Sequence, residues 1–273
     1  MLFAMSMALV FIVSLLMLGL VAGFLAGLLG VGGGIVIVPG LLFVFQALGM
    51  ESESLIHVCV GTSLALIIPN GLMSARAHHL KGAVDFSLVR MIGFGIVAGV
   101  ILASLIANDL SGRALQMIFA GAIVVLALIM VLNPARFEVF QKMPGQPWPS
   151  IAGGIIGLVS SLIGIGGGTL SVPFMSACRV PIHKAIGTAA ALGVVIAVPG
   201  AIGFMLIGLG EAGRPPFSIG YVNILAWALI LPTSLLAVKV GVWAAHKAPV
   251  ELMRWVFAGF MVIVAVKLWL DIL

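Results

Sequence analysis

Long apolar runs separated by short polar segments extend along the whole chain of 273 residues. The clearest runs are each about as long as the roughly 20 residues that a helix needs to cross a bilayer. None shows the ten-residue alternation of transmembrane strands. The pattern therefore predicts an all-α polytopic membrane protein, with spans over residues 55–75, 87–107, 115–132, 185–209, 219–240 and 250–270.

Composition supports the same class. The chain is 63% hydrophobic and 8% charged, with a mean hydropathy of +1.33, whereas soluble domains carry about 25% charged residues. The net charge of +5 is spread over loops and forms no basic stripe, so nucleic acid is not an expected partner. Two cysteines are too few for a disulfide framework.

Two halves of the chain repeat each other. Residues 23–39 align with residues 157–173, and the G-x-GGG-x₄-P core is identical at every fixed position. Further matches follow in the same order: His57 with His183, Thr62 with Thr188, and Asp85 with Asn223. The pattern predicts a first membrane repeat over 1–132, a cytoplasmic linker over 133–149 and a second membrane repeat over 150–273.

The segment that opens each half is interrupted by glycines, so it either crosses once or turns back. If each crosses once, the 13 Lys and Arg residues divide 7 to 6 between the two faces. If each turns back, only Arg113, Arg214 and Lys267 lie on one face and the other ten of the 13 on the opposite face. The positive-inside rule favours the second arrangement.

The returning arrangement predicts two inverted repeats, each a re-entrant hairpin plus three transmembrane helices. Both termini then lie outside and the linker lies in the cytoplasm. Residues 150–163 would form a helix of about 21 Å, too short to span. The first limb, from near Met5, is long enough to span, so the number of full crossings stays open between six and ten.

The glycine breaks lie at residues 30–34 and 164–168. Consecutive glycines leave backbone N–H groups uncovered and allow a ligand to approach closely. The β-branched residues at 35–38 and 169–172 precede a proline, which favours extended structure there. Pro39 and Pro173 then suit the first position of a helix.

Broken helices in inverted repeats are typical of secondary transporters, whose sites lie where the discontinuous segments meet. N–H donors and the positive end of a helix dipole suit an anion without a buried Arg or Lys. The alternative is that these glycines only allow close helix crossing. The candidate backbone site is formed by Gly32, Gly33, Gly34, Gly166, Gly167 and Gly168.

A small set of polar side chains at mid-membrane depth completes the candidate substrate site. It comprises Thr62, Ser63, Asn70, Ser160, Ser161, Thr169, Ser171 and Thr188. The alternative is that the hydroxyls bond back to the preceding helical turn. His57 and His183 are the repeat-matched groups that titrate near neutrality, which makes them candidates for proton coupling. Both lie near span ends, where an interfacial histidine is the alternative.

Carboxylates are missing from the middle of every predicted span, although cation transporters and proton pumps usually keep one there. The chain also carries no phosphate-binding loop, zinc-ligand cluster, haem-attachment motif or nucleophile elbow. We therefore expect no enzyme activity, no cofactor and no metal.

Two G-x-GGG motifs, each followed by a β-branched stretch and a proline, resemble the TauE/SafE family of membrane transporters. The stretches 61–63 and 81–85 resemble that family too, so the likeness covers essentially the whole chain. The resemblance implies export of sulfite or organosulfonates such as sulfoacetate. The second copy departs in having Ala189 where the first has Ser63, and Asn223 where the first has Asp85.

The leading hypothesis is a secondary carrier or uniporter that exports a small anion across a membrane of the bacterial inner-membrane type. The expected partners are that anion and the lipid bilayer, with a homodimer as an open alternative. Two other functions stay open: a non-transporting accessory or assembly protein, and a proton-coupled importer of a small organic anion.

Overall fold

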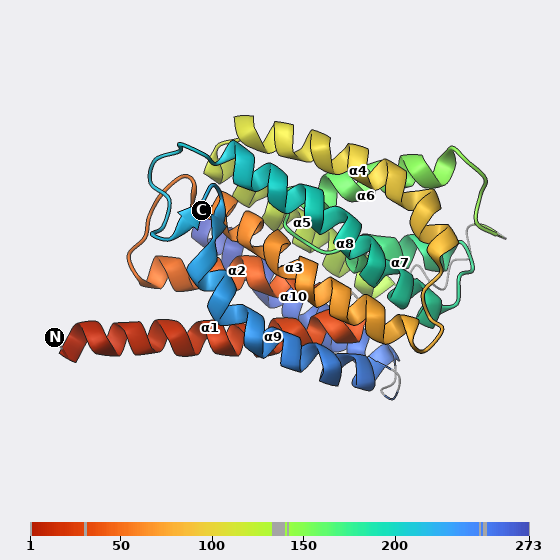
Figure 1. The fold of residues 1–273 in the computed structure, drawn as a ribbon, viewed down its shortest axis with the longest axis horizontal. Coiled ribbons are helices and arrows are strands. Elements are labelled where there is room, and N and C mark those ends of the chain that lie inside the picture. Colours follow the sequence, from red (N-terminus) through yellow and green to blue (C-terminus); the bar gives the residue numbers. More distant parts are fainter. Residues whose placement is uncertain are drawn as a thin grey trace.

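The computed structural model describes residues 2–29, 32–132, 140, 142–245, 247 and 250–272. Helices run along the long axis of the molecule (Figure 1). In chain order they are α1 (Leu2–Leu29), α2 (Gly34–Ala47), α3 (Leu55–His79), α4 (Phe86–Asp109), α5 (Gly112–Leu132), α6 (Trp148–Leu162), α7 (Gly168–Ala177), α8 (Ile182–Ile207), α9 (Ile224–Ala245) and α10 (Val250–Ile272).

The protein is an all-α polytopic membrane protein. Five helices in the described part of the chain, α1, α3, α4, α8 and α9, are long and apolar enough to cross a membrane. The helices α5 and α10, of 21 and 23 residues, occupy the two remaining predicted spans and pack against each other. The predicted α-helical class is thus confirmed.

Both chain ends lie at one end of the molecule, and the residues that precede α6 lie at the other (Figure 1). We call these the terminal end and the linker end. Of the predicted linker, residues 133–139 and 141 lie outside the described residues. The helix α6 begins at Trp148, two residues before the predicted repeat boundary.

The glycine breaks join helices that run in opposite directions. From the terminal end α1 runs inward and α2 returns to that end, whereas α6 runs inward from the linker end and α7 returns to it (Figure 1). The helices α6 and α7 have 15 and 10 residues, or about 22 and 15 Å. Neither reaches across a hydrocarbon core of about 30 Å.

The segments that follow the glycines are helical, so the extended structure predicted for residues 35–38 and 169–172 is wrong. The helices α2 and α7 begin at Gly34 and Gly168, and Pro39 and Pro173 each lie at the sixth position of a helix instead of the first. A buried extended segment would leave its backbone polar groups unpaired, whereas a helix pairs them internally. This requirement overrides the local preference of β-branched residues.

A short β-hairpin precedes α9, where the span predicted over 219–240 was expected to begin. Strands β1 (Ser218–Ile219) and β2 (Val222–Asn223) pair antiparallel, with Ser218 opposite Asn223. The turn lies at Gly220, whose φ is 53°. The helix therefore begins five residues later than predicted, at Ile224.

Contacts between helices recur in pairs that follow the sequence repeat. In the first half, the backbone N–H of Asp85 donates to Thr188 Oγ1 of the second half at 3.0 Å. In the second half, the backbone N–H of its counterpart Asn223 donates to Thr62 Oγ1 of the first half at 2.8 Å. The side chain of Asp85 accepts from the first turn of α4, as Asn223 does for α9. The division into two inverted repeats remains our interpretation of these paired contacts.

Close glycine packing joins two pairs of helices, α1 with α9 and α4 with α6. A Cβ on Gly23 would meet the backbone of Ser234 in α9, and one on Gly157 would meet the backbone of Ile96 in α4. These positions are also equivalent in the sequence repeat. Small residues thus let these helix axes approach closely. The glycines that do so lie outside the two glycine breaks.

Candidate functional site

The two glycine breaks contact each other between α3 and α8. A Cβ on Gly34, the first residue of α2, would collide with the carbonyl oxygen of Gly164 in the turn between α6 and α7. It would also lie 3.0 Å from Ser63 Oγ of α3. The Ser63 hydroxyl donates to that same Gly164 carbonyl at 2.8 Å. Backbone from both hairpins and a polar side chain of α3 therefore meet at one point.

Both turns are enclosed by protein. All residues from 32 to 39 and from 160 to 169 are buried. A Cβ on Gly32 would lie 2.8 Å from Ile67 Cγ2 of α3, and one on Gly167 would lie 2.8 Å from the Gly193 nitrogen of α8. Gly33 has a φ of 82°, a conformation that glycine adopts without strain. The crossing of α3 and α8 thus holds the two breaks in place.

Neither half-helix that starts at a break has a side-chain cap. Gly33 is the N-cap of α2 and Gly167 is the N-cap of α7, and neither position supplies a side-chain hydrogen bond. The first N–H groups of an α-helix have no partner inside the helix, and together they form its positive end. Two such ends lie buried near the contact between the hairpins.

Besides Ser176 near the C-terminal end of α7, four hydroxyls of the second hairpin, all on buried residues, have no hydrogen-bond partner: Ser160, Ser161, Thr169 and Ser171. Each is at most 1% exposed. Some buried hydroxyls of other helices are paired: Ser104 donates to Val100 O and Ser234 donates to Leu231 O of their own helices. A buried unpaired hydroxyl costs about 1–3 kcal/mol. The unpaired set therefore fits donors directed to a ligand better than helix-bonded hydroxyls.

Charged side chains are missing from this region. Among the residues described, the buried polar side chains are Ser, Thr, Asn and His, and none is Lys, Arg, Asp or Glu. The same part of the chain contains no group of three or more His, Cys, Asp or Glu side chains able to hold a metal ion. The groups available to a ligand here are backbone N–H groups and hydroxyls.

The remaining candidate side chains, Thr62, Thr188 and Asn70, have hydrogen-bond partners on other helices. Thr62 and Thr188 accept the N–H groups of Asn223 and Asp85, so they anchor the starts of α9 and α4. The side chain of Asn70 is fully buried, and its Oδ1 accepts from Ser234 Oγ at 2.9 Å. The hydrogen bonds of these three side chains go to the starts of α4 and α9 and to Ser234 of α9, and not to the hairpin backbone.

The two candidate histidines lie at opposite ends. His57, near the start of α3 at the terminal end, is 4% exposed, and its Nε2 lies 3.1 Å from Ala107 O. Its ring packs on Tyr221, with 5.0 Å between ring centroids. His183, near the start of α8, is exposed at the linker end. Neither lies at the hairpin contact, and their role in proton coupling stays a prediction.

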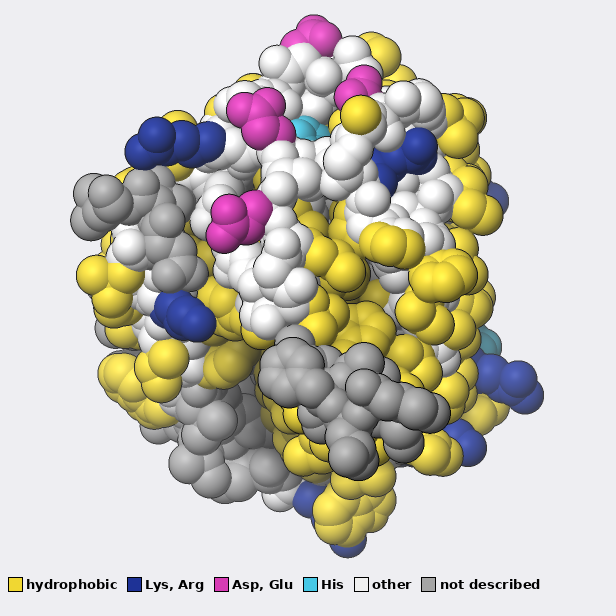
Figure 2. Space-filling view, turned by 90° about the vertical axis from the view of Figure 1, so that its left-hand side faces the viewer, with side chains coloured by type: hydrophobic (Ala, Val, Ile, Leu, Met, Phe, Trp, Pro, Cys, Tyr) yellow, Lys and Arg dark blue, Asp and Glu magenta, His cyan; other side chains and the backbone are white. Residues whose placement is uncertain are grey.

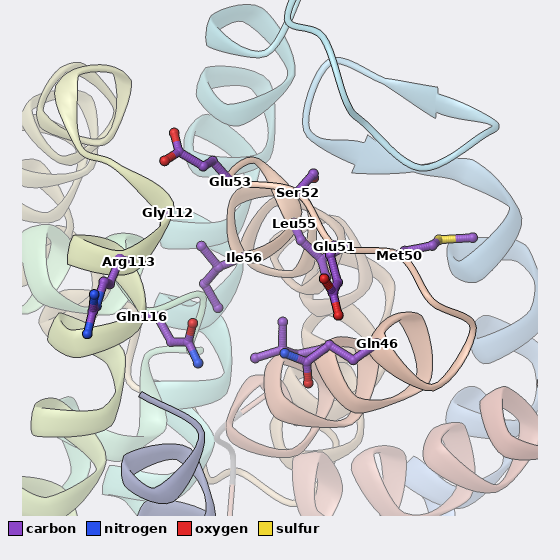
Figure 3. Close-up of a pocket in the computed structure, with 11 residues that line it drawn as sticks. Gln46, Met50, Glu51, Ser52, Glu53, Leu55, Ile56, Gly112, Arg113 and Gln116 are labelled. Carbon is purple, nitrogen blue, oxygen red and sulfur yellow. The ribbon is translucent and has the colours of Figure 1, made fainter. Parts of the chain in front are cut away.

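A polar pocket of about 460 Å³ opens at the terminal end, between α2 and α5. Figure 3 shows Gln46 and Gln116 extending into it. Its lining also includes Glu51, Glu53 and Arg113. Acidic side chains gather over the terminal end (Figure 2). This surface pocket lies away from the glycine contact, and its carboxylates make it a poor anion site.

Gly164 was missed as a site residue, although its carbonyl is the point where Gly34 and Ser63 meet. The signal was present, because Gly164 and Gly30 occupy the same place in the repeated motif. The φ of Gly164 is 65°, a left-handed conformation that glycine tolerates. Ser234, which bonds Asn70 across the helix interface, gave no comparable signal.

Comparisons with known proteins bear on the whole chain. The family described as sulfite exporter TauE/SafE matches residues 15–268. A probable membrane transporter protein of Haemophilus influenzae is 37% identical over 95% of this chain and 98% of its own length. The probable membrane transporter protein YunE of Bacillus subtilis is 30% identical over 72% of this chain and 79% of its own length. No solved structure matches.

The family match includes at least part of every helix of both halves, and the relatives are named as transporters, not enzymes. The chain therefore belongs to the TauE/SafE family of multi-pass membrane transporters.

Proposed function

We propose that this protein exports a small anion, such as sulfite or an organosulfonate, by a secondary-carrier or uniport mechanism. The anion is held where the two glycine hairpins meet. The observation that carries this proposal is the contact of Gly34 with Gly164 beside two uncapped helix ends and four unpaired hydroxyls. A compact oxyanion accepts several hydrogen bonds at once, which is what such donors supply.

The chemistry of the site favours a small anion over a cation. Helix N-termini attract negative charge, and the buried polar side chains described here include no carboxylate. Backbone N–H groups also bind an oxyanion without the desolvation cost of burying a lysine or arginine. The family description, sulfite exporter TauE/SafE, supports sulfur oxyanions as the first substrates to test.

The proposed orientation places both termini outside and the linker end in the cytoplasm. It rests on the loops at the linker end, which carry most of the basic residues of the chain, as the positive-inside rule requires. In this orientation the first hairpin enters from outside and the second from inside, as in an inverted repeat. The site then lies at the centre, where alternating access needs it.

Export of a monovalent anion is expected to need only the membrane potential. Outward movement from a negative interior gains about 2.3 kcal/mol per 100 mV, an equilibrium ratio of about 50-fold for a uniporter. The measurement uses proteoliposomes with a potassium diffusion potential and labelled methanesulfonate, which stays monovalent at any pH. Labelled sulfite is measured beside it.

Empty liposomes and a zero-potential sample are the controls. A distribution that ignores the potential and follows an imposed pH gradient would contradict uniport and favour the proton-coupled importer. Protein-containing vesicles with no flux of either anion would favour the accessory-protein alternative.

A further inference from the structure

A line of polar side chains runs along one face of α3 from the hairpin contact toward the linker end. It consists of Asn70, Ser74 and His78, one helical turn apart, each at most 1% exposed. Ser63, which bonds Gly164, precedes Asn70 by two turns and lies on the same face. From Ser63 to His78 the line is about 22 Å long. We call Asn70, Ser74 and His78 the α3 polar stripe.

The α3 polar stripe faces the pair formed by α1 and α9. Asn70 Oδ1 accepts from Ser234 of α9 at 2.9 Å, and His78 Nε2 lies 3.4 Å from the Gly27 carbonyl oxygen of α1. Between these anchors, Asn70 Nδ2 and Ser74 Oγ are buried without a partner. Unpaired buried donors are costly, so packing alone does not explain why they are there.

The second half of the chain shows that the fold does not require these polar groups. At the offset that relates Thr62 to Thr188, the counterparts of Asn70, Ser74 and His78 on α8 are Ile196, Gly200 and Phe204. The Ile196 and Phe204 side chains are 0% exposed. The same position in the fold is therefore packed with apolar groups in one half and with polar groups in the other.

We propose that the α3 polar stripe lines the route by which the anion passes between the hairpin site and the linker end. The proposal rests on the proposed function and adds the residues of one half-channel. In this structure the route is closed, because α1 and α9 pack on the stripe. It opens when that glycine-packed pair separates from α3, and the unpaired Asn70 and Ser74 donors then face the passing anion.

Cysteine accessibility tests this route without depending on which anion is carried. The parent variant replaces the two buried cysteines, Cys59 and Cys178, by alanine. Ser74→Cys is then treated with a membrane-impermeant, sulfonate-bearing thiol reagent from each side of oriented membrane vesicles. We expect it to react from the linker side at least tenfold faster than the control Ile196→Cys, a fully buried apolar position on α8 that corresponds to Asn70 of the stripe.

Reaction of Ser74→Cys no faster than the control, or only from the terminal side, would overturn the route. Sulfite flux of the parent, measured separately, reports on the proposed function. If the parent shows no sulfite flux but Ser74→Cys is labelled fast from the linker side, the proposed substrate is wrong and the proposed route stands. If the parent shows normal sulfite flux but Ser74→Cys is not labelled, the proposed route is wrong and the proposed substrate stands.

A second variant applies if Ser74→Cys does not fold. Asn70→Leu removes a half-paired amide and leaves Ser234 bonded to Leu231 O. If Asn70 lines the route, Asn70→Leu should lose at least tenfold in sulfite flux per folded molecule while its thermal midpoint stays unchanged. Unchanged flux with a lowered thermal midpoint would assign Asn70 a structural role and overturn the proposal.

Discussion

Gly34→Ala is expected to reduce sulfite flux by about 10- to 100-fold. Overpacking a buried site costs about 1–3 kcal/mol, and we expect this strain to destabilise the anion-bound form of the site. The added methyl group meets the Gly164 carbonyl oxygen and would lie 2.9 Å from Ile165 Cα, both backbone atoms that cannot turn aside. The two hairpins must then separate. The measurement is sulfite efflux from proteoliposomes, normalised to folded protein.

Gly121→Ala is the matched control, because a Cβ on this glycine of α5 meets nothing within 4 Å. It makes the same chemical change in an apolar helix and should leave flux at the wild-type level. Equal flux from Gly34→Ala and Gly121→Ala would show that the contact between the hairpins is not used in transport.

The double substitution Thr169→Val and Ser171→Ala is expected to raise stability and weaken transport together. Both hydroxyls are buried without partners in α7, and removing each relieves up to about 1–3 kcal/mol of desolvation cost. Removing the same donors from the site should raise the KM for sulfite at least tenfold, which is about 1.4 kcal/mol. Thermal unfolding and concentration-dependent flux are measured on the same preparation.

Ser104→Ala is the control for that experiment. The Ser104 hydroxyl donates to Val100 O of its own helix, so its loss should change stability by no more than about 0.5–1.5 kcal/mol and leave the KM unchanged. A double variant with wild-type KM would remove the α7 hydroxyls from the site. A lower thermal midpoint of the double variant would show that the Thr169 and Ser171 hydroxyls stabilise the fold.

The two halves contribute different groups to the proposed site. The hydroxyls of Thr169 and Ser171 have the counterparts Ile35 and Ile37 in the first hairpin, which are buried and apolar. Conversely Ser63 of α3 corresponds to Ala189 of α8. The first half thus supplies a backbone helix end and the Ser63 hydroxyl that bonds the Gly164 carbonyl, and the second supplies a helix end and the hydroxyls of its hairpin. Such asymmetry fits the proposed binding of one anion between the two halves.

Hydropathy predicted the six long spans, because an apolar run of about 20 residues is long enough to cross the bilayer as a helix. The predicted spans 55–75 and 185–209 correspond to α3 and α8 within a few residues. The glycine breaks were also predictable, since a duplicated Gly-rich motif in an apolar run is readable without a structure. Ser63, Gly34 and the α7 hydroxyls followed from their depth and position in the repeat.

Sequence alone could not show which partner each polar group faces. The bond from Asn223 N–H to Thr62 Oγ1 joins residues 161 positions apart, and no local pattern reports it. Depth likewise could not separate Ser104, which bonds its own helix, from Ser160, which does not. Ser74 and His78 continue the helical spacing that begins at Asn70, so that spacing was the available signal for the α3 polar stripe.

The central claim is that an anion binds where the two glycine hairpins meet. An anomalous diffraction map of crystals grown with selenite, at concentrations where selenite competes with sulfite flux, tests it most directly. The account predicts a selenium peak beside the N-termini of α2 and α7, within hydrogen-bonding range of Thr169 or Ser171. A peak only in the terminal-end pocket beside Arg113, or no peak at such concentrations, would contradict it.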